Sequence, residues 1–349
     1  MNVATPNREV IAVERWLLLL YFMILAMVAI GGITRLTGSG LSMVDWRPLF
    51  GVLPPLNEAQ WHSVFERYQQ FPQYLHVNQW MQLDDFKRIY FWEYLHRLWG
   101  RTIGVVFALP FFWFWLRGKL PLGQKRRIAI AFLLGGAQGL LGWFMVKSGL
   151  ADRPEVSHFR LAAHFMLANV VACWILWIWL DLRRGPRSAE CAGRPIDRRM
   201  TVLLLIVVVV QMTYGAFMAG TRAGFLFSTF PTFNGAWLPV GLNPRSGWLV
   251  AAWSDPIMIH VIHRFLGLLV LTLVAATVWL GRQADLGLRL LNRHLLLVTA
   301  LQVVLGIVTL FSHIDILLAV SHQLFGCLLL SVVIMRLHQL TFSQKTAGL

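Results

Sequence analysis

The stretch Trp16–Thr34 reads WLLLLYFMILAMVAIGGIT and contains no charged residue. An uncharged apolar run of about 18 residues or more is long enough to cross the hydrocarbon core of a bilayer as a helix. The run is too long for the apolar part of a signal peptide, and no clear small-residue cleavage site follows it. We therefore expect a transmembrane helix here rather than a leader segment.

Seven further segments of the same kind follow along the chain. The eight predicted spans are Trp16–Thr34, Tyr94–Leu116, Ile128–Val146, Leu161–Leu180, Thr201–Ala219, Pro256–Leu280, His294–Phe311 and Ile316–Leu337. Of the 349 residues, 57% are hydrophobic and 13% are charged, against about 25% charged in an ordinary soluble domain. This composition excludes a disordered chain, a coiled coil and a disulfide-rich secreted module. It predicts an all-α polytopic membrane protein.

The net charge of +15 results from 31 Lys and Arg against 16 Asp and Glu. A soluble nucleic-acid-binding protein needs more polar surface than this chain has, so we expect no nucleic-acid partner. With a cytoplasmic N-terminus, 18 basic and 6 acidic residues fall inside, which leaves +12 inside and +3 outside. Because an excess of Lys and Arg in short loops marks the cytoplasmic side, both termini are predicted to be cytoplasmic.

The first outer loop, residues 36–92, is the only long connection between predicted spans. Loops of this length are more often functional than idle. The loop is rich in aromatic residues, which predicts short amphipathic pieces at the outer membrane interface, with a solvated spacer as the alternative. These aromatic residues are Trp46, Trp61, Phe71, Trp80 and Phe91.

The two halves of the chain resemble each other. YLHRLWG at 94–100 matches VIHRFLG at 261–267, and QGLLG at 138–142 matches QVVLG at 302–306. Each pair falls on the equivalent span of its half, which predicts two pseudo-symmetric four-helix bundles. The predicted domains are an N-terminal bundle at 1–182, a cytoplasmic linker at 183–199 and a C-terminal bundle at 200–349.

Four of the eleven histidines occupy equivalent positions of this repeat, near the outer ends of spans: His96, His164, His263 and His322. An ionisable side chain inside a span is costly, so it indicates a functional site. Two histidines on different helices of one bundle provide the two axial nitrogens of a heme iron. Four residues after each histidine stands a small residue, which leaves room for a flat macrocycle, although close helix packing gives the same pattern. These small residues are Gly100, Ala168, Gly267 and Gly326.

Arginines near the histidines are candidate partners for heme propionates. Arg97 and Arg264 directly follow two of the histidines, and Arg35 and Arg222 lie at other outer helix ends. A carboxylate such as a propionate is bound well by a guanidinium. The alternative for each is an arginine that only extends to the membrane interface.

One position differs between the halves. Glu93 lies one helical turn before His96, and the aligned residue of the second half is His260. A carboxylate beside a heme can accept a proton or stabilise a developing cation. The first half is therefore predicted to carry out chemistry and the second to hold a redox cofactor. The alternative for Glu93 is an interfacial carboxylate that a helix N-terminus stabilises.

At these residues the sequence resembles the heme A synthase family, over nearly the whole chain. The most specific stretches are GGITRLTGSGLSMVDW at 31–46, DFKRI at 85–89, EYLHRLWGR at 93–101, HRFLG at 263–267 and HQ at 322–323. The long outer loop contains no cysteine pair, so the chain resembles the branch that proteobacteria and mitochondria share.

The resemblance implies an inner-membrane oxidoreductase that oxidises the C8 methyl group of heme O to a formyl group, giving heme A for cytochrome oxidase. Heme b would be the cofactor of the C-terminal bundle, with His263 and His322 as axial ligands. Heme O would bind in the N-terminal bundle, where His96 and His164 face its iron and Glu93 is the catalytic carboxylate. Both sites would lie toward the periplasmic side.

The expected partners are heme O, a heme O synthase, cytochrome oxidase assembly factors and membrane lipid. The residues alone leave two other functions open, a two-heme b-type electron-transfer protein and a heme transporter or assembly chaperone. Glu93, which has no counterpart in the second half, and the enlarged first outer loop favour the enzyme.

Overall fold

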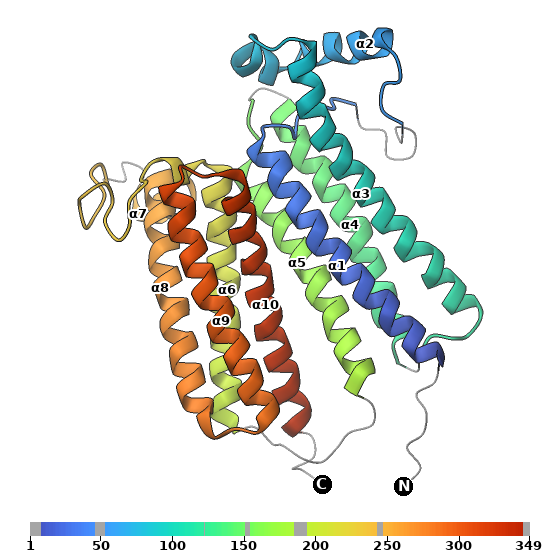
Figure 1. Ribbon diagram of the computed structural model, residues 1–349, viewed down its shortest axis with the longest axis vertical. Helices are drawn as coiled ribbons and strands as arrows, with labels where there is room; N and C mark the ends of the chain where they lie inside the picture. The colour runs from blue at the N-terminus through green and yellow to red at the C-terminus, as the bar shows by residue number, and fades with distance from the viewer. Residues whose placement is uncertain are drawn as a thin grey trace. The chain divides into compact units, whose positions relative to one another are not determined.

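The computed structural model describes residues 8–45, 53–121, 123–150, 154–184, 194–242 and 247–344. Eight long helices dominate this part of the chain (Figure 1). They are α1 (Arg8–Leu36), α3 (Leu83–Leu116), α4 (Lys125–Leu150), α5 (His158–Arg184), α6 (Pro195–Gly220), α8 (Pro256–Leu280), α9 (Leu286–Phe311) and α10 (Ile316–Gln344). All eight are long and apolar enough to cross a membrane, and the described residues form no strand. The predicted all-α membrane fold is confirmed.

Five shorter helices join the long ones. They are α2 (Glu58–Tyr68), the π-helical turn η1 (Tyr74–Asn78), the 3₁₀ turns η2 (Ala223–Phe225) and η3 (Gly281–Gln283), and α7 (Trp248–Ser254). Aspartates begin the three long helices of the last third. Asp255 accepts a hydrogen bond from the Met258 N–H at 2.9 Å before α8, Asp285 accepts one from the Leu288 N–H at 2.8 Å before α9, and Asp315 accepts one from the Leu318 N–H at 3.1 Å before α10. These caps satisfy backbone donors that the first turn leaves unpaired.

The described chain divides into two compact units, and the division falls within α1 and α5. Unit 1 comprises 1–9 and 19–171, and unit 2 comprises 10–18 and 172–349. In unit 2, α6 packs against α8 and α10, while α9 packs against α10 and α8. In unit 1, α3 packs against α4 and α2, and the Trp99 indole of α3 donates to the Met23 carbonyl of α1 at 2.9 Å.

α3 begins eleven residues before the predicted span that starts at Tyr94. The Gln82 and Asp85 side chains form a reciprocal capping box that begins the helix at Leu83. Hydropathy identifies only the apolar part of a helix. The first turns of α3 carry charged residues, so the predicted span did not include them. As a result Glu93 lies in the interior of α3, and the interpretation of Glu93 as a helix N-terminal carboxylate does not hold.

The connection between α1 and α3 folds around a small core of its own. α2, η1 and the first turns of α3 bury a largely aromatic cluster of Phe65, Tyr68, Met81, Phe86, Ile89 and Tyr90. Trp61 packs against this cluster, with its ring centroid 5.1 Å from that of Tyr90. The predicted short segments of this loop therefore form helices. The Trp61 side chain, however, packs against the internal core of the loop. Trp46 lies outside the described residues.

A buried tyrosine ties this core to the end of α1. The Tyr68 hydroxyl donates to Gln73 Oε1 at 3.0 Å and accepts from Asn78 Nδ2 at 2.7 Å. Gln73 Nε2 in turn donates to the Gly38 carbonyl at 2.8 Å. Burial raises the pKa of Tyr68 to about 12, because the phenolate would lose its hydration there.

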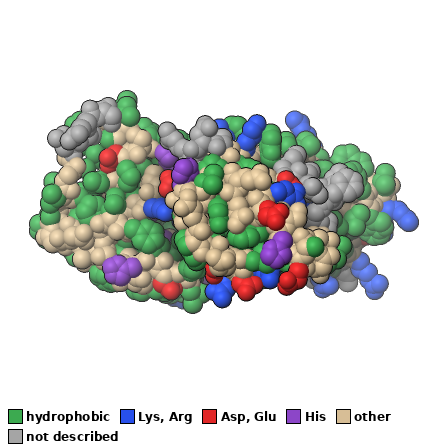
Figure 2. All heavy atoms as spheres, turned by 90° about the horizontal axis from the view of Figure 1, so that it is seen from above, with side chains coloured by type: hydrophobic (Ala, Val, Ile, Leu, Met, Phe, Trp, Pro, Cys, Tyr) green, Lys and Arg blue, Asp and Glu red, His purple; other side chains and the backbone are tan. Residues whose placement is uncertain are grey.

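Hydrophobic side chains spread between a few charged ones over the face that Figure 2 shows. The connection before α7 contains Trp237 and Val240, which are 76% and 85% exposed. The long helices themselves also expose apolar side chains, such as Leu109 of α3 and Leu133 of α4 at 68% each, which fits helices surrounded by lipid.

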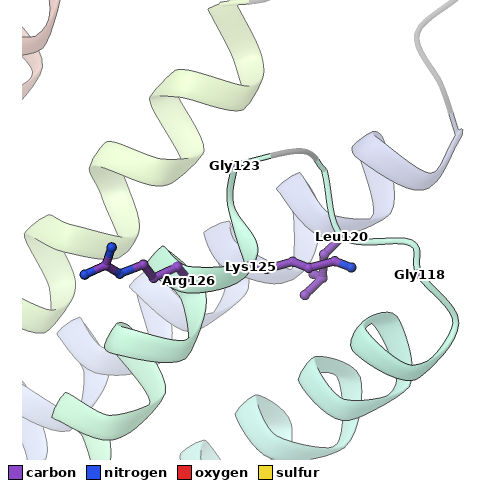
Figure 3. A pocket seen from close by; sticks show the side chains of 5 residues that line it. All are labelled: Gly118, Leu120, Gly123, Lys125 and Arg126. Atoms are coloured by element: carbon purple, nitrogen blue, oxygen red, sulfur yellow. The ribbon is translucent and has the colours of Figure 1, made fainter.

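A hollow lies at the turn between α3 and α4, at the opposite end of α3 from His96. Its lining residues are Gly118, Leu120, Gly123, Lys125 and Arg126 (Figure 3). The side chains of Lys125 and Arg126 extend in opposite directions. They do not converge on one point, so the hollow is not a candidate ligand site.

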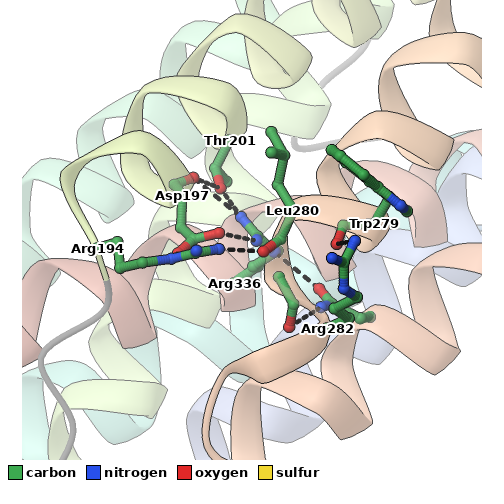
Figure 4. A network of polar contacts seen from close by, with 9 residues as sticks. Arg194, Asp197, Thr201, Trp279, Leu280, Arg282 and Arg336 are labelled. Carbon is green, nitrogen blue, oxygen red and sulfur yellow. Dashed lines mark hydrogen bonds and ion pairs between the residues drawn. The ribbon is translucent and has the colours of Figure 1, made fainter.

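Unit 2 contains a buried polar network at the start of α6 (Figure 4). The fully buried Arg336 of α10 donates from Nε to Asn292 Oδ1 at 3.0 Å and from Nη1 to the Asp197 carbonyl at 3.1 Å. It also donates to the Thr201 hydroxyl. Arg194 reaches the Asp197 carboxylate at 3.2 Å from the other side. The network joins α6, α9 and α10 through groups that would be costly to bury alone.

Candidate functional site: two histidine pairs and their covering segments

In unit 1 each of the two repeat-related histidines packs its ring against a glycine of a neighbouring helix. A Cβ atom added at Gly31 of α1 would lie 3.1 Å from His96 Nε2. One added at Gly142 of α4 would lie 2.9 Å from His164 Cε1. Protein interiors are packed so closely that separations this short leave no space for a side chain. The two glycines therefore let α1 and α4 approach the imidazoles.

Unit 2 repeats this arrangement at the equivalent positions. A Cβ atom at Gly215 of α6 would lie 3.2 Å from His263 Cε1, and one at Gly306 of α9 would lie 2.8 Å from His322 Cε1. Within each unit the two histidines are near enough to interact electrostatically. The sequence repeat is thus matched by repeated side-chain packing inside each unit.

Side chains of neighbouring helices cover the glycines that follow the histidines by four residues. Met27 Cε would lie 3.3 Å from a Cβ at Gly100 in unit 1. In unit 2, Gln302 Nε2 would lie 3.3 Å from a Cβ at Gly326, and Gln211 covers Gly267 in the same way. The Oε1 atoms of these two glutamines and of Gln138 in unit 1 are buried without a hydrogen-bond partner among the described residues.

Two equivalent histidines differ in the hydrogen bonds of their rings. His322 Nδ1 lies 3.1 Å from the main-chain carbonyl of Gln302. Because a carbonyl only accepts, Nδ1 carries the proton and Nε2 keeps its lone pair for a metal. His164 and His263 also lie beside the main chain of a neighbouring glutamine, Gln138 and Gln211, but among the described residues their Nδ1 atoms make no hydrogen bond of this quality. The ring hydrogen bond therefore fixes the tautomer of His322 and does not separate unit 2 from unit 1 as a whole.

These features fit heme better than a bare metal ion. Across the ranges that the structure describes, no three His, Cys, Asp or Glu side chains gather as ligands for an ion. Each unit instead has two histidines, glycine contacts beside them, and buried glutamine oxygens that lack partners. A heme iron takes two histidine nitrogens as axial ligands, and this is what each pair offers.

The Glu93 carboxylate is 3% exposed and accepts three short hydrogen bonds. Its Oε2 accepts from the Ser42 hydroxyl and the Met43 N–H, both at 2.7 Å, and its Oε1 accepts from Arg97 Nη2 at 2.6 Å. Hydrogen bonds to a charged acceptor are about twice as strong as neutral ones. Glu93 therefore anchors the chain that follows α1.

Arg97 strengthens the same attachment. Its Nη2 donates to the Met43 carbonyl at 2.6 Å, and its Nη1 donates to the Asp45 carbonyl at 2.8 Å. In this conformation the guanidinium holds the segment after α1. Its predicted contact with a heme propionate stays a prediction.

The second half uses the aligned residues in the same way. His260 is fully buried, and its Nδ1 lies 2.9 Å from the Ala223 carbonyl. Arg264 Nε donates to His260 Nε2 at 2.9 Å, and Arg264 Nη1 donates to the Thr232 carbonyl at 3.0 Å. The guanidinium also lies 4.1 Å from the Phe233 ring centroid. Here a neutral imidazole takes the place of the carboxylate.

Comparison with known proteins addresses the function of this arrangement. Residues 14–334 match a family described as cytochrome oxidase assembly protein. A heme A synthase of Rhodospirillum centenum is 42% identical over 343 residues, which cover 97% of this chain and 91% of that protein. The chain belongs to the heme A synthase family. The resemblance found in the sequence is confirmed.

Two further members of the heme A synthase family show the same extent of similarity. The heme A synthase of Paramagnetospirillum magneticum is 42% identical over 331 residues, covering 93% of this chain and 92% of that protein. That of Novosphingobium aromaticivorans is 40% identical over 349 residues, covering 96% and 97%. The family likeness therefore extends over both histidine pairs.

The remaining two candidate arginines lie at helix ends of this family member. Arg35 is half-buried in the last turn of α1. Arg222 is exposed just after α6, in the left-handed backbone region with φ of 56°. Equivalent positions of the repeat thus differ in backbone conformation, and the role of both residues at propionates stays a prediction.

Sequence reasoning missed the groups that hold Glu93. Ser42 and Met43 lie within the stretch that carries the heme A synthase resemblance, but a single serine and a backbone N–H have no signal of their own. The role of Gly31 and Gly215 was missed for the same reason. The repeated QxxxG pattern did contain Gly142 and Gly306.

Proposed function

We propose that this protein is a heme A synthase, which oxidises the C8 methyl group of heme O to a formyl group. One observation carries the proposal: the chain builds the same glycine-backed histidine pair twice, and only one copy has a carboxylate at the position that precedes its histidine by one turn. A duplicated electron-transfer protein has no need of this difference.

We assign heme O to unit 1 and heme b, as resident cofactor, to unit 2. Glu93 supports the first assignment, because a carboxylate beside His96 can accept a proton from substrate. The hydrogen bond between His322 Nδ1 and the Gln302 carbonyl at 3.1 Å supports His322 as an axial ligand in the second. Outer-shell bonds of this kind fix the tautomer and orientation of a metal-binding histidine and typically raise metal affinity about 10–100-fold.

In this assignment His263 and His322 hold heme b, which supplies one-electron redox chemistry when bound. His96 and His164 bind the substrate and set its orientation. With water as the source of the formyl oxygen, conversion of the methyl group to the formyl group consumes one water and releases four protons and four electrons, and the electrons pass to an acceptor outside this chain. We infer that a carboxylate oxygen of Glu93 accepts one of these protons at the reacting carbon, and that Arg97 stabilises the carboxylate between turnovers.

The protein is an integral multi-pass membrane protein. We propose that it lies in the inner membrane with both termini in the cytoplasm and both histidine pairs toward the periplasm, because the short basic connections require this orientation. The two pseudo-symmetric bundles at 1–182 and 200–349, joined by the linker at 183–199, complete the proposed architecture. A heme O synthase and cytochrome oxidase assembly factors are its proposed partners.

Mass analysis of pigments extracted from the purified protein tests the function. The proposal predicts heme b together with heme O or its hydroxylated and formylated products. Heme b alone, with no heme O-derived pigment, contradicts the proposal and favours a two-heme cytochrome. Heme O that leaves the protein unmodified, with no product in the membranes, indicates a transporter instead.

A further inference from the structure

The segment Ser39–Asp45 crosses the end of unit 1 and contacts two of its helices. Ser42 and Met43 bind Glu93 of α3. Leu41 is 3% exposed, and its two methyl carbons would lie 2.9 Å from a Cβ at Gly149 in the last turn of α4. A segment that leaves α1 and is buried against both α3 and α4 closes this end of the unit.

Further polar contacts fix both ends of the segment. Ser39 N–H donates to the Thr34 carbonyl at 2.9 Å, and its hydroxyl lies 2.6 Å from the Thr37 hydroxyl. At the other end, the Asp45 carboxylate is paired with Arg67 of α2 at 2.5 Å. The contacts of Ser42 and Met43 with Glu93 lie between these two ends of the segment. They involve the proposed catalytic carboxylate.

The residues aligned in the repeat, Glu93 and His260, separate attachment of the covering segment from a chemical role. His260 and Arg264 hold the 223–233 segment of unit 2 without a carboxylate. Attachment of a covering segment therefore requires only a polar side chain, which donates in unit 2 and accepts in unit 1, and an arginine four residues later. The carboxylate of Glu93 must serve a further purpose, and its geometry is set by the donors that surround it.

We propose that Ser42 is a positioning residue for heme A synthesis, and that the Ser39–Asp45 segment is a lid that sets the Glu93 carboxylate in its working geometry. This rests on the proposed function. A carboxylate on a flexible side chain rotates freely, whereas Ser42 and Met43 bind one of its oxygens and Arg97 the other. Proton transfer is sensitive to such geometry, because donor and acceptor must lie within hydrogen-bond reach.

The test compares Ser42→Ala and Ser42→Thr with the control Ser331→Ala in the full-length protein. Ser331 is buried as Ser42 is, but it lies in α10 of unit 2, where its hydroxyl donates to the Cys327 carbonyl at 2.8 Å. Hydrogen–deuterium exchange of peptides that contain the Met43 amide reports the lid directly. The ratio of heme A to heme O in extracted pigments reports the reaction.

We expect Ser42→Ala to increase exchange at Met43 and to lower the heme A to heme O ratio by about tenfold, as expected for one lost hydrogen bond to a charged group. Heme b content stays unchanged, Ser42→Thr restores the ratio, and Ser331→Ala stays within about twofold of wild type.

Unchanged exchange at Met43 in Ser42→Ala would overturn the proposal that the segment is a lid. Increased exchange with a heme A to heme O ratio equal to that of Ser331→Ala would overturn the positioning role. If wild type forms no heme A at all, the proposed function fails, whereas the exchange measurement still tests the contact between Ser42 and Glu93.

Discussion

Glu93 and His260 occupy the same position of the repeat and differ in the charge that they present. Both accept hydrogen bonds and both are linked to an arginine four residues later. Both ring nitrogens of His260 are engaged, Nδ1 with the Ala223 carbonyl and Nε2 with Arg264. The carboxylate of Glu93 can also take a proton from a substrate, which makes unit 1 the reactive one in our proposal.

Replacing Glu93 by Gln removes the proton acceptor and keeps a carbonyl oxygen for the Ser42 hydroxyl. General base catalysis contributes about 10²–10⁴-fold, so we expect heme A formation to fall at least about 100-fold with normal heme b content. Pigment analysis of purified Glu93→Gln measures both. Glu66→Gln, on the exposed side of α2, serves as the control. Normal heme A output from Glu93→Gln would show that the carboxylate has no chemical role.

Glycines 139 and 142 offer a matched pair on α4. A Cβ at Gly142 would lie 2.9 Å from His164 Cε1, whereas one at Gly139 has no neighbour within 4 Å. We therefore expect Gly142→Ala to displace the His164 ring and to lower the heme O bound to the purified protein severalfold. Gly139→Ala should bind it normally, since its methyl group meets open space. Equal heme O content in the two variants would show that the glycine contact does not shape the site.

Among the helices, α3 best separates what sequence can predict from what it cannot. Its apolar part from Tyr94 onward was predicted from hydropathy, and the histidine that it carries was predicted from the repeat. Its start at Leu83 depends on a capping box and on packing of Phe86 and Tyr90 against α2. Such contacts between distant segments leave no periodic pattern in the sequence. The same reason explains why the donors to Glu93 were missed.

The polar network of α6, α9 and α10 makes a prediction about stability. Arg336 Nη2 lies 3.7 Å from Asp197 Oδ1, and Arg336→Leu leaves this buried carboxylate with Arg194 as its remaining cation. Breaking a buried ion pair costs up to about 3–5 kcal/mol. We expect a clear fall in the thermal unfolding temperature of the purified protein. The double variant Asp197→Leu with Arg336→Leu should recover part of the loss. A double variant less stable than Arg336→Leu would contradict this account.

The two halves of the sequence repeat one pattern, and they differ at the position that Glu93 and His260 occupy. The fold class, the eight spans and the histidines of both halves followed from hydropathy and the internal repeat. The proposed division of labour between the units rests on Glu93, the carboxylate that unit 2 replaces by an imidazole.

The most direct test of this division is the pigment content of His164→Ala and His322→Ala, purified side by side and analysed by mass. The account predicts that His322→Ala loses heme b and keeps heme O, while His164→Ala keeps heme b and loses heme O and its products. Loss of heme b from His164→Ala with retention in His322→Ala would contradict the assignment of the two units.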